Sequence, residues 1–212
     1  MPDEPKPQEP AAPERTPTFA EMTAQKVQEQ FSDEVTDASE FRGDWTITVK
    51  KGRIVEILAF LRDDPALDYR FLADVTAVDY AGYLGSDPPA RFGVIYNLCS
   101  YLQSAHEGYL KTAHRGRVRV KALVPEREAV IASAVPVWKG ALWPEREVYD
   151  MFGIRFEGHP DLRRILMPVN FKDFPLRKDY PLKGKGERDV IAPEDPGFVN
   201  IEDVIKLRGS HA

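Results

Sequence analysis

Four stretches of this chain have the alternation or the composition of β-strands. They cover residues 45–50, 69–80, 92–98 and 117–122. In residues 45–50, apolar and polar side chains alternate with a period of two, which places the apolar ones on one face of a strand. The last stretch alternates in the same way and carries basic residues on its outer face. The pattern therefore predicts a small sheet that packs one face against a core.

Apolar residues at helical spacing predict a first helix that begins at Thr18. Thr18 and Glu21 have the spacing of a capping box, in which the hydroxyl accepts from an early helix N–H and the carboxylate reaches back. The residues behind them form a rough apolar stripe: Phe19, Met22, Val27 and Phe31. We expect this helix to run to about Phe31.

Two further helices are expected before residue 135. Residues 54–61 are apolar around most of a helical circumference, which predicts a well-buried helix that stops before Pro65. Pro125 and Glu126 are expected to open a short helix that runs to about Ala134.

A fourth helix is predicted just after Trp143. Pro144 suits the first helical position, where its missing N–H costs nothing, and Gly153 suits the position after the end. Glu145 and Glu147 favour the positive end of the helix dipole.

The two sides of this fourth helix differ in chemistry. Arg146 and Asp150 are four residues apart and are expected to pair across one turn. The apolar face consists of Val148, Met151 and Phe152. After the helix, residues 156–160 predict a tight turn, and residues 164–166 are expected to run extended out of it.

The chain from residue 162 to residue 188 is basic, although the whole protein has a net charge of −5. It contains eight Lys or Arg and three acidic residues. From residue 168 to residue 196, prolines recur too often for a long helix. They are Pro168, Pro175, Pro181, Pro193 and Pro196. Large apolar residues are interleaved with the charges: Phe171, Phe174, Leu176, Tyr180 and Leu182. These anchors favour a protein groove over RNA or lipid head groups, so we expect a partner to order this arm.

Composition excludes several functions. One cysteine, Cys99, cannot hold an iron–sulfur cluster, and the four histidines are scattered. There is no Gly-rich dinucleotide or phosphate loop, and the negative charge argues against nucleic-acid binding. The apolar run from Ile57 to Leu61 is far too short for a membrane span, which predicts a soluble, cytoplasmic chain. Residues 1–17 are rich in proline and are expected to be disordered.

The stretch from about residue 138 to residue 182 resembles the 30 kDa subunit family of respiratory complex I, whose bacterial members are the C subunits of NADH:quinone oxidoreductase. The residues that fill the family signature are Glu145, Arg146, Glu147, Asp150, Met151, Phe152, His159, Arg163, Ile165 and Leu166. A second hallmark is similar in residues 175–181, which include Arg177, Lys178, Asp179 and Tyr180. A looser resemblance reaches back to about residue 45 and includes residues 71–76.

The resemblance implies an α+β fold with a small mixed sheet flanked by helices. Composition predicts the disordered tail over residues 1–17, which lies outside the resemblance, and we expect a body over 18–166 and an extended C-terminal arm over 167–212. The arm is expected to embrace the D subunit, which helps form the quinone pocket, with the B and I subunits nearby. NADH, FMN, iron–sulfur clusters and quinone are expected in other subunits, so that this chain binds no cofactor. Its expected place is the cytoplasmic face of the bacterial inner membrane, where it is held through the proton-translocating complex.

Three alternatives stay open at this point. A related membrane-bound hydrogenase or ferredoxin-accepting complex uses a similar subunit. Glu145, Glu147 and Asp150 could serve general acid–base catalysis in a stand-alone enzyme, although helix-end electrostatics is the simpler interpretation. His159 could relay protons, but in a Gly-His-Pro turn we expect it to anchor the chain by hydrogen bonds.

Overall fold

The structure is a computed structural model that describes residues 16–83, 90–106 and 109–185. Most of the expected N-terminal tail, 1–17, and the end of the expected arm lie outside these residues. Within them the fold is α+β, as expected. None of the helices in the described ranges is long and apolar enough to cross a bilayer.

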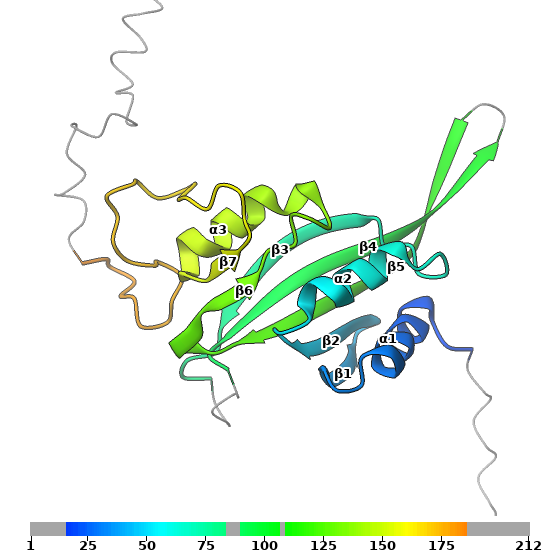
Figure 1. The fold of residues 1–212 in the computed structure, drawn as a ribbon, viewed down its shortest axis with the longest axis horizontal. Coiled ribbons are helices and arrows are strands. Elements are labelled where there is room, and N and C mark those ends of the chain that lie inside the picture. The colour runs from blue at the N-terminus through cyan, green and yellow to red at the C-terminus, as the bar shows by residue number, and fades with distance from the viewer. Residues whose placement is uncertain (1–15, 84–89, 107–108, 186–212) are drawn as a thin grey trace, which may run out of the picture.

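A five-stranded mixed sheet forms the centre of the molecule (Figure 1). Its spatial order is β1-β2-β5-β4-β3, and only the β2–β5 pair is parallel. The strands are β1 (Val35–Phe41), β2 (Asp44–Lys50), β3 (Phe71–Asp79), β4 (Phe92–His106) and β5 (Tyr109–Val124). A separate two-stranded parallel sheet consists of β6 (Val130–Ala132) and β7 (Arg155–Glu157).

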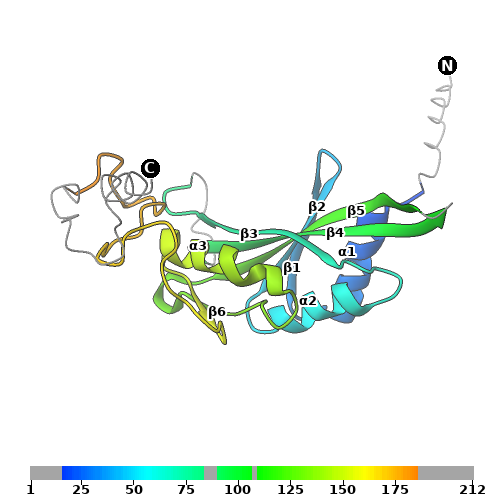
Figure 2. The same ribbon diagram turned by 90° about the horizontal axis from the view of Figure 1, so that it is seen from above.

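Three α-helices lie on one side of the central sheet (Figure 2). They are α1 (Phe19–Gln30), α2 (Ile54–Asp63) and α3 (Leu142–Phe152). Two short 3₁₀ turns, Glu126–Glu128 and Lys139–Ala141, connect the later elements. This arrangement explains why alternate residues of β4 and β5 are completely buried. The cross-strand pairs Val94↔Ala122, Tyr96↔Val120 and Leu98↔Val118 face the helices together.

The predicted helices α1 and α2 are confirmed, and so is the capping box of α1. Thr18 Oγ accepts from the Glu21 N–H at 3.2 Å, and the Glu21 carboxylate accepts from the Thr18 N–H at 3.4 Å. Val27 and Phe31 are buried as expected, but Met22 is largely exposed. The apolar stripe is therefore narrower than its sequence suggests.

The helix expected from Pro125 to Ala134 is wrong. Only Glu126–Glu128 form a single 3₁₀ turn, and Val130–Ala132 then form β6. β6 pairs with β7, which is more than twenty residues further along the chain, and Val130 and Ile131 are β-branched residues that favour a strand. β1 was not predicted from the sequence either, because most of its residues are exposed and it therefore lacks apolar alternation.

β4 and β5 run well beyond the expected stretches 92–98 and 117–122. At the point where the two strands leave the sheet, Gly116 of β5 lies against the Phe19 ring of α1. A Cβ at Gly116 would lie 2.5 Å from Phe19 Cδ1, which is closer than packed atoms approach. Only glycine fits at this crossing without a shift of the Phe19 side chain.

We expect Gly116→Ala to lower the free energy of unfolding by about 1–3 kcal/mol, since overpacking displaces Phe19. Gly140→Ala is the matched control, because a Cβ there meets nothing within 4 Å. Urea denaturation of the two variants measures the difference. Equal stability of both would show that α1 moves aside at no cost.

Candidate functional site

The signature helix α3 begins at Leu142, two residues before the predicted start. The 3₁₀ turn Lys139–Ala141 leads directly into it, so Pro144 is the third residue of the helix and not the first. A proline is tolerated there because the first four N–H groups of a helix have no partner within it. Gly153 ends the helix in the left-handed conformation, with φ of 75°, as predicted.

Glu145 points into the core and is fully buried. It accepts the Ser133 hydroxyl at 2.6 Å and the Ala134 N–H at 2.6 Å. Burial raises the pKa of Glu145 to about 7, although both hydrogen bonds act in the opposite direction. The carboxylate therefore fastens the segment after β6 to α3 and is not available to a substrate.

The pair expected between Arg146 and Asp150 is wrong. Arg146 Nε donates to the Arg163 carbonyl at 3.1 Å, and Arg146 Nη2 donates to the Arg164 carbonyl at 2.9 Å. Helical spacing favours the predicted pair on an isolated helix, but the returning chain offers both groups closer partners.

Asp150 is also fully buried, and the chain after β7 wraps around its carboxylate. Oδ2 accepts three successive backbone N–H groups, those of Ile165, Leu166 and Met167, at 3.0, 2.7 and 2.8 Å. Arg164 Nη1 donates to Oδ1 at 2.6 Å. Residues 165–167 consequently form a bend, so the expectation that residues 164–166 run extended is wrong.

Burial by itself raises the pKa of Asp150. The three N–H groups and Arg164 outweigh that effect and hold the pKa below its usual value. Asp150 is therefore an ionised anchor, whereas Glu145, earlier on the same helix, has fewer donors and no cation.

The segment that follows, residues 163–185, is named the strap. It supplies partners for the last carbonyl groups of α3, which a helix leaves without internal partners. Arg164 donates to the Asp150 carbonyl at 3.1 Å, and the Leu176 N–H donates to the Met151 carbonyl at 3.1 Å. Arg177 Nε donates to the Phe152 carbonyl at 2.6 Å. Two guanidinium groups thus lie at the negative end of the helix dipole.

The strap packs closely on the glycine that ends α3. A Cβ at Gly153 would lie 2.5 Å from the Phe174 ring and 2.6 Å from Arg177 Nη2. The same Phe174 ring lies below the guanidinium groups of Arg164 and Arg177, at 5.3 and 4.6 Å. A side chain at position 153 would therefore push the strap away from the helix.

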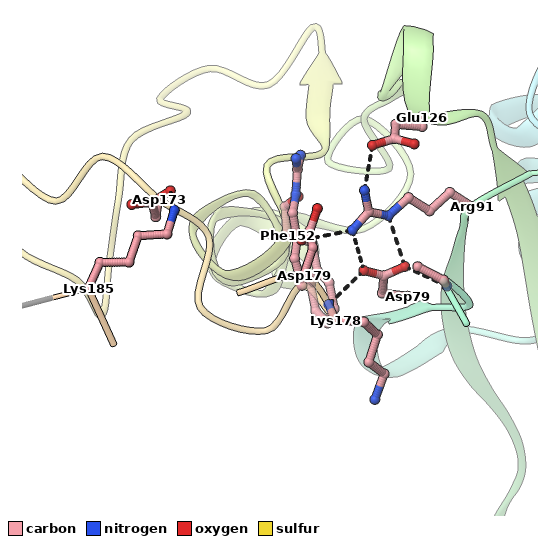
Figure 3. Close-up of polar contacts among 10 residues, drawn as sticks. Asp79, Arg91, Glu126, Phe152, Asp173, Lys178, Asp179 and Lys185 are labelled. Atoms are coloured by element: carbon pink, nitrogen blue, oxygen red, sulfur yellow. Dashed lines mark hydrogen bonds and ion pairs between the residues drawn. The ribbon is translucent and has the colours of Figure 1, made fainter. Parts of the chain in front are cut away.

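A second ionic cluster holds the strap to the end of β3 and the start of β4 (Figure 3). Arg91 donates to both oxygens of the buried Asp79, at 3.0 and 2.8 Å, and pairs with Asp179 at 2.9 Å. Arg91 also contacts Glu126, and the Lys178 N–H donates to Asp79 at 2.9 Å. Burial raises the pKa of Asp79, but Arg91 and the backbone N–H groups prevail and keep the pKa low.

Most remaining signature residues also have structural contacts. His159 Nδ1 accepts the Asp161 N–H at 3.0 Å, so Nε2 carries the proton and donates to the Leu142 carbonyl at 2.9 Å. This geometry supports the predicted anchoring role. Met151 and Phe152 are buried, and Tyr180 lies beside Phe171 at 6.2 Å between ring centres.

The outward side of the strap is different in character. Of the nine large apolar side chains exposed in the described residues, five belong to α3 or the strap: Trp143, Leu166, Val169, Leu176 and Leu182. A groove of about 480 Å³ lies between α3 and the strap, and Ile165 and Glu147 are among its lining residues. Lys172, Lys178 and Lys183 are exposed around these apolar residues. An apolar surface with a basic rim is typical of a protein-binding site.

Sequence patterns predicted an arm that a partner orders, but residues 163–185 are held by the chain's own body. The sequence patterns also did not single out four residues as members of this site: Asp79, Arg91, Arg164 and Ser133. A polar residue at the end of an apolar strand, as in Asp79, was the available signal. Among the residues that the structure describes, no three His, Cys, Asp or Glu side chains are grouped as a metal ion would require.

Comparisons with known proteins agree on one family. Residues 47–186 match the family described as the 30 Kd subunit of respiratory-chain NADH dehydrogenase. The chain is 49% identical over 159 residues to the C subunit of NADH-quinone oxidoreductase from Citrifermentans bemidjiense, which covers 75% of this chain and 88% of the relative. It is also 49% identical to the same subunit of Geobacter metallireducens, over 76% of this chain and 89% of that one.

Two solved structures share the fold. One is a trypsin-resistant fragment of Nqo5, with 33% identity and a TM-score of 0.53, which covers 66% of this chain and all of the fragment. The other belongs to a membrane-bound sulfane sulfur reductase, an archaeal respiratory membrane complex, with a TM-score of 0.57 over 85% of this chain and 95% of that one. At 18% identity, this second likeness shows the fold alone.

The raised pKa of Glu145 predicts that stability falls as the pH rises. Between the usual carboxyl pKa of 4.5 and about 7, the folded state holds a proton that the unfolded state has released. The contribution of Glu145 is therefore complete below pH 4.5 and is lost by pH 8, at a cost of up to about 3 kcal/mol. Glu145→Gln should remove this dependence, as measured by urea denaturation at pH 5 and pH 8. Parallel pH profiles for the two proteins would contradict the assignment.

We expect Asp150→Asn to lower the free energy of unfolding by about 3–5 kcal/mol, because it leaves the guanidinium of Arg164 buried without its anion. Glu147→Gln changes an exposed carboxylate on the same helix and should cost less than about 0.5 kcal/mol. Chemical denaturation of both variants at pH 7 provides the measurement. A small effect of Asp150→Asn would mean that the strap does not depend on this carboxylate.

Proposed function

Because the chain belongs to the 30 kDa subunit family of respiratory-chain NADH dehydrogenase, we propose that it is a structural subunit in the peripheral arm of a proton-translocating NADH:quinone oxidoreductase. In this proposal it holds the D subunit, which carries the quinone site, with the B and I subunits nearby. The complex lies on the cytoplasmic face of the membrane. Electrons pass from NADH through FMN and iron–sulfur clusters to quinone in the other subunits, and this chain binds none of those groups.

The single observation that carries the binding role is the outward surface of the strap. The inward side of the strap is bound to the rest of the same chain, through Asp150, Asp79 and the last carbonyl groups of α3. Its outward side exposes Leu166, Val169, Leu176 and Leu182, which water solvates poorly. The strap contains seven Lys or Arg and two Asp. A partner with apolar pockets and acidic groups at their edge would complement it.

The buried carboxylates support a structural role over acid–base catalysis. Glu145 and Asp150 each accept hydrogen bonds from their own chain and are fully buried. A general acid or base must reach a substrate proton within hydrogen-bonding distance. The exposed Glu147 is the one signature carboxylate that a partner could contact.

A body that stays folded when it is separated from the complex is consistent with this proposal. The Nqo5 fragment that shares the fold is described as trypsin-resistant, which is typical of a compact domain. The strap then adds a pre-ordered binding surface to a stable body. Pre-ordering lowers the entropy cost of association.

We expect the double variant Leu176→Asp with Leu182→Asp to assemble into the complex at least about tenfold less well, since buried anchors contribute most of the affinity of an interface. The bond from the Leu176 N–H to α3 survives the change, so the isolated subunit should unfold at the same temperature. The assembled fraction on a native gel and the NADH:quinone turnover per assembled complex are measured separately. Turnover per assembled complex should be unchanged.

Phe41→Asp is the matched control, because Phe41 is also an exposed apolar residue but lies on β1, away from the strap. It should assemble normally. Normal assembly of the double variant would contradict binding through the strap. Normal assembly with lost turnover would instead indicate a role in the chemistry.

A further inference from the structure

The hairpin of β4 and β5 continues far beyond the sheet. β3 accompanies β4 only as far as the pair Phe71↔Cys99, and β2 accompanies β5 only from the pair Trp45↔Val118. The pairing of β4 with β5 continues from Ser100↔Gly116 to His106↔Tyr109 with no other described strand on either side. At about 3.4 Å per residue, the ribbon extends roughly 24 Å past its neighbours. Figure 1 shows it as the projecting hairpin in green.

The base of this ribbon is firmly fixed to the body. Ser100 Oγ donates to the Leu67 carbonyl at 2.7 Å, and the Tyr101 ring packs edge-on against Phe71 at 5.9 Å. On the other strand, Gly116 lies against Phe19, and the Arg115 guanidinium stacks on the same ring at 4.1 Å. The body therefore presents the ribbon in a set direction.

A lone two-stranded ribbon is only marginally stable in water. Both of its edges carry backbone N–H and C=O groups that no other described strand uses, and such an edge is a template for a further strand. The ribbon has no proline between residues 100 and 117 to block pairing. The sequence of the ribbon also mixes polar with apolar residues, among them Gln103, Ser104, Lys111 and Thr112. Recognition through the backbone edge suits this composition better than packing on a face.

The two edges differ in charge. Lys111, Arg115 and Arg117 all belong to β5, whereas residues 100–106 of β4 contain no Lys or Arg. At the base of the β5 edge lies a groove of about 330 Å³, and Thr18, Gly43 and Arg115 are among its lining residues. Asp44, the acidic residue of this groove, is shared between Arg117 and Arg119 at 2.8 and 2.6 Å. The edge and the groove together keep an excess of positive charge.

We propose that the free edge of β5 from Tyr109 to Gly116 binds an extended, acidic segment of a neighbouring subunit, which adds to the sheet as a strand in line with β2. The groove beside Arg115 receives the end of that segment. The proposal rests on the place of this chain in a multi-subunit complex, and it concerns a surface separate from the strap. Backbone pairing supplies the affinity, and the cations of β5 select an acidic sequence.

Hydrogen exchange of the isolated subunit and of the intact complex tests the pairing directly. Amides of residues 109–116 should exchange at least about tenfold more slowly in the complex, since a new ladder protects those on the free edge. Residues 118–123 already lie between β2 and β4, so their exchange should be unchanged. Equal exchange of residues 109–116 in both states would overturn the proposal.

Two variants test whether the ribbon and its charge are needed for assembly. In the first, residues 103–112 are replaced by Asn-Gly, which closes the hairpin at the pair Leu102↔Ala113 with a two-residue turn and leaves the base intact. In the second, Lys111→Glu reverses one charge, with Arg127→Glu on an exposed turn as its control. Both ribbon variants should assemble at least about tenfold less well, while the isolated proteins keep their melting temperature. Normal assembly of the shortened ribbon would overturn the proposal.

A photo-crosslinking residue at position 112 in the complex then identifies what lies on the edge. Crosslinks to an acidic extended segment of another subunit are the expected result. Crosslinks confined to lipid, to a second copy of this chain or to this chain itself would contradict it.

The strap variant Leu176→Asp with Leu182→Asp separates the two proposals. If it fails to assemble while the shortened ribbon assembles normally, the ribbon inference is wrong and the proposed function stands.

Discussion

The end of α3 is the constraint on which the C-terminal part of this structure depends. Met151 and Phe152 are buried, so the carbonyls of the last helical turn need protein partners in place of water. Gly153 supplies one through its N–H to the Tyr149 carbonyl at 2.9 Å. Arg164, the Leu176 N–H and Arg177 supply the others. The strap therefore completes the helix, and the helix in turn gives the strap its shape.

The two buried carboxylates of α3 show how the number of donors decides protonation. Glu145 receives two hydrogen bonds and no cation, so burial prevails and raises its pKa. Asp150 receives three backbone N–H groups and a guanidinium, which keep its pKa low. At neutral pH Glu145 is thus only partly ionised, whereas Asp150 is ionised and orders the returning chain. Both act on the fold of their own chain.

The contacts of the strap give it an inward side, which is bound to its own chain, and an outward side, which is exposed. Asp179 and Arg177 make contacts within the chain, whereas four apolar side chains of the strap are exposed: Leu166, Val169, Leu176 and Leu182. A rigid strap and a projecting ribbon offer two binding surfaces on one body. Such a protein positions its partners in an assembly. Because its binding surfaces are already ordered, they associate at a lower entropy cost.

The sequence determined helices α1 and α2, the buried faces of β4 and β5 and the family signature, because these follow from local spacing and from residue types. The α+β class followed from the resemblance that this signature carries. The partners of the signature residues were decided by tertiary structure alone. Arg146 and Asp150 have ideal spacing to pair, yet the returning strap offers each a closer partner. The helix expected over residues 125–134 is replaced by β6, which pairs with the distant β7, and Asp79 accepts from the Lys178 N–H, 99 residues further along the chain. Contacts over such separations depend on the path of the whole chain, which local spacing does not encode.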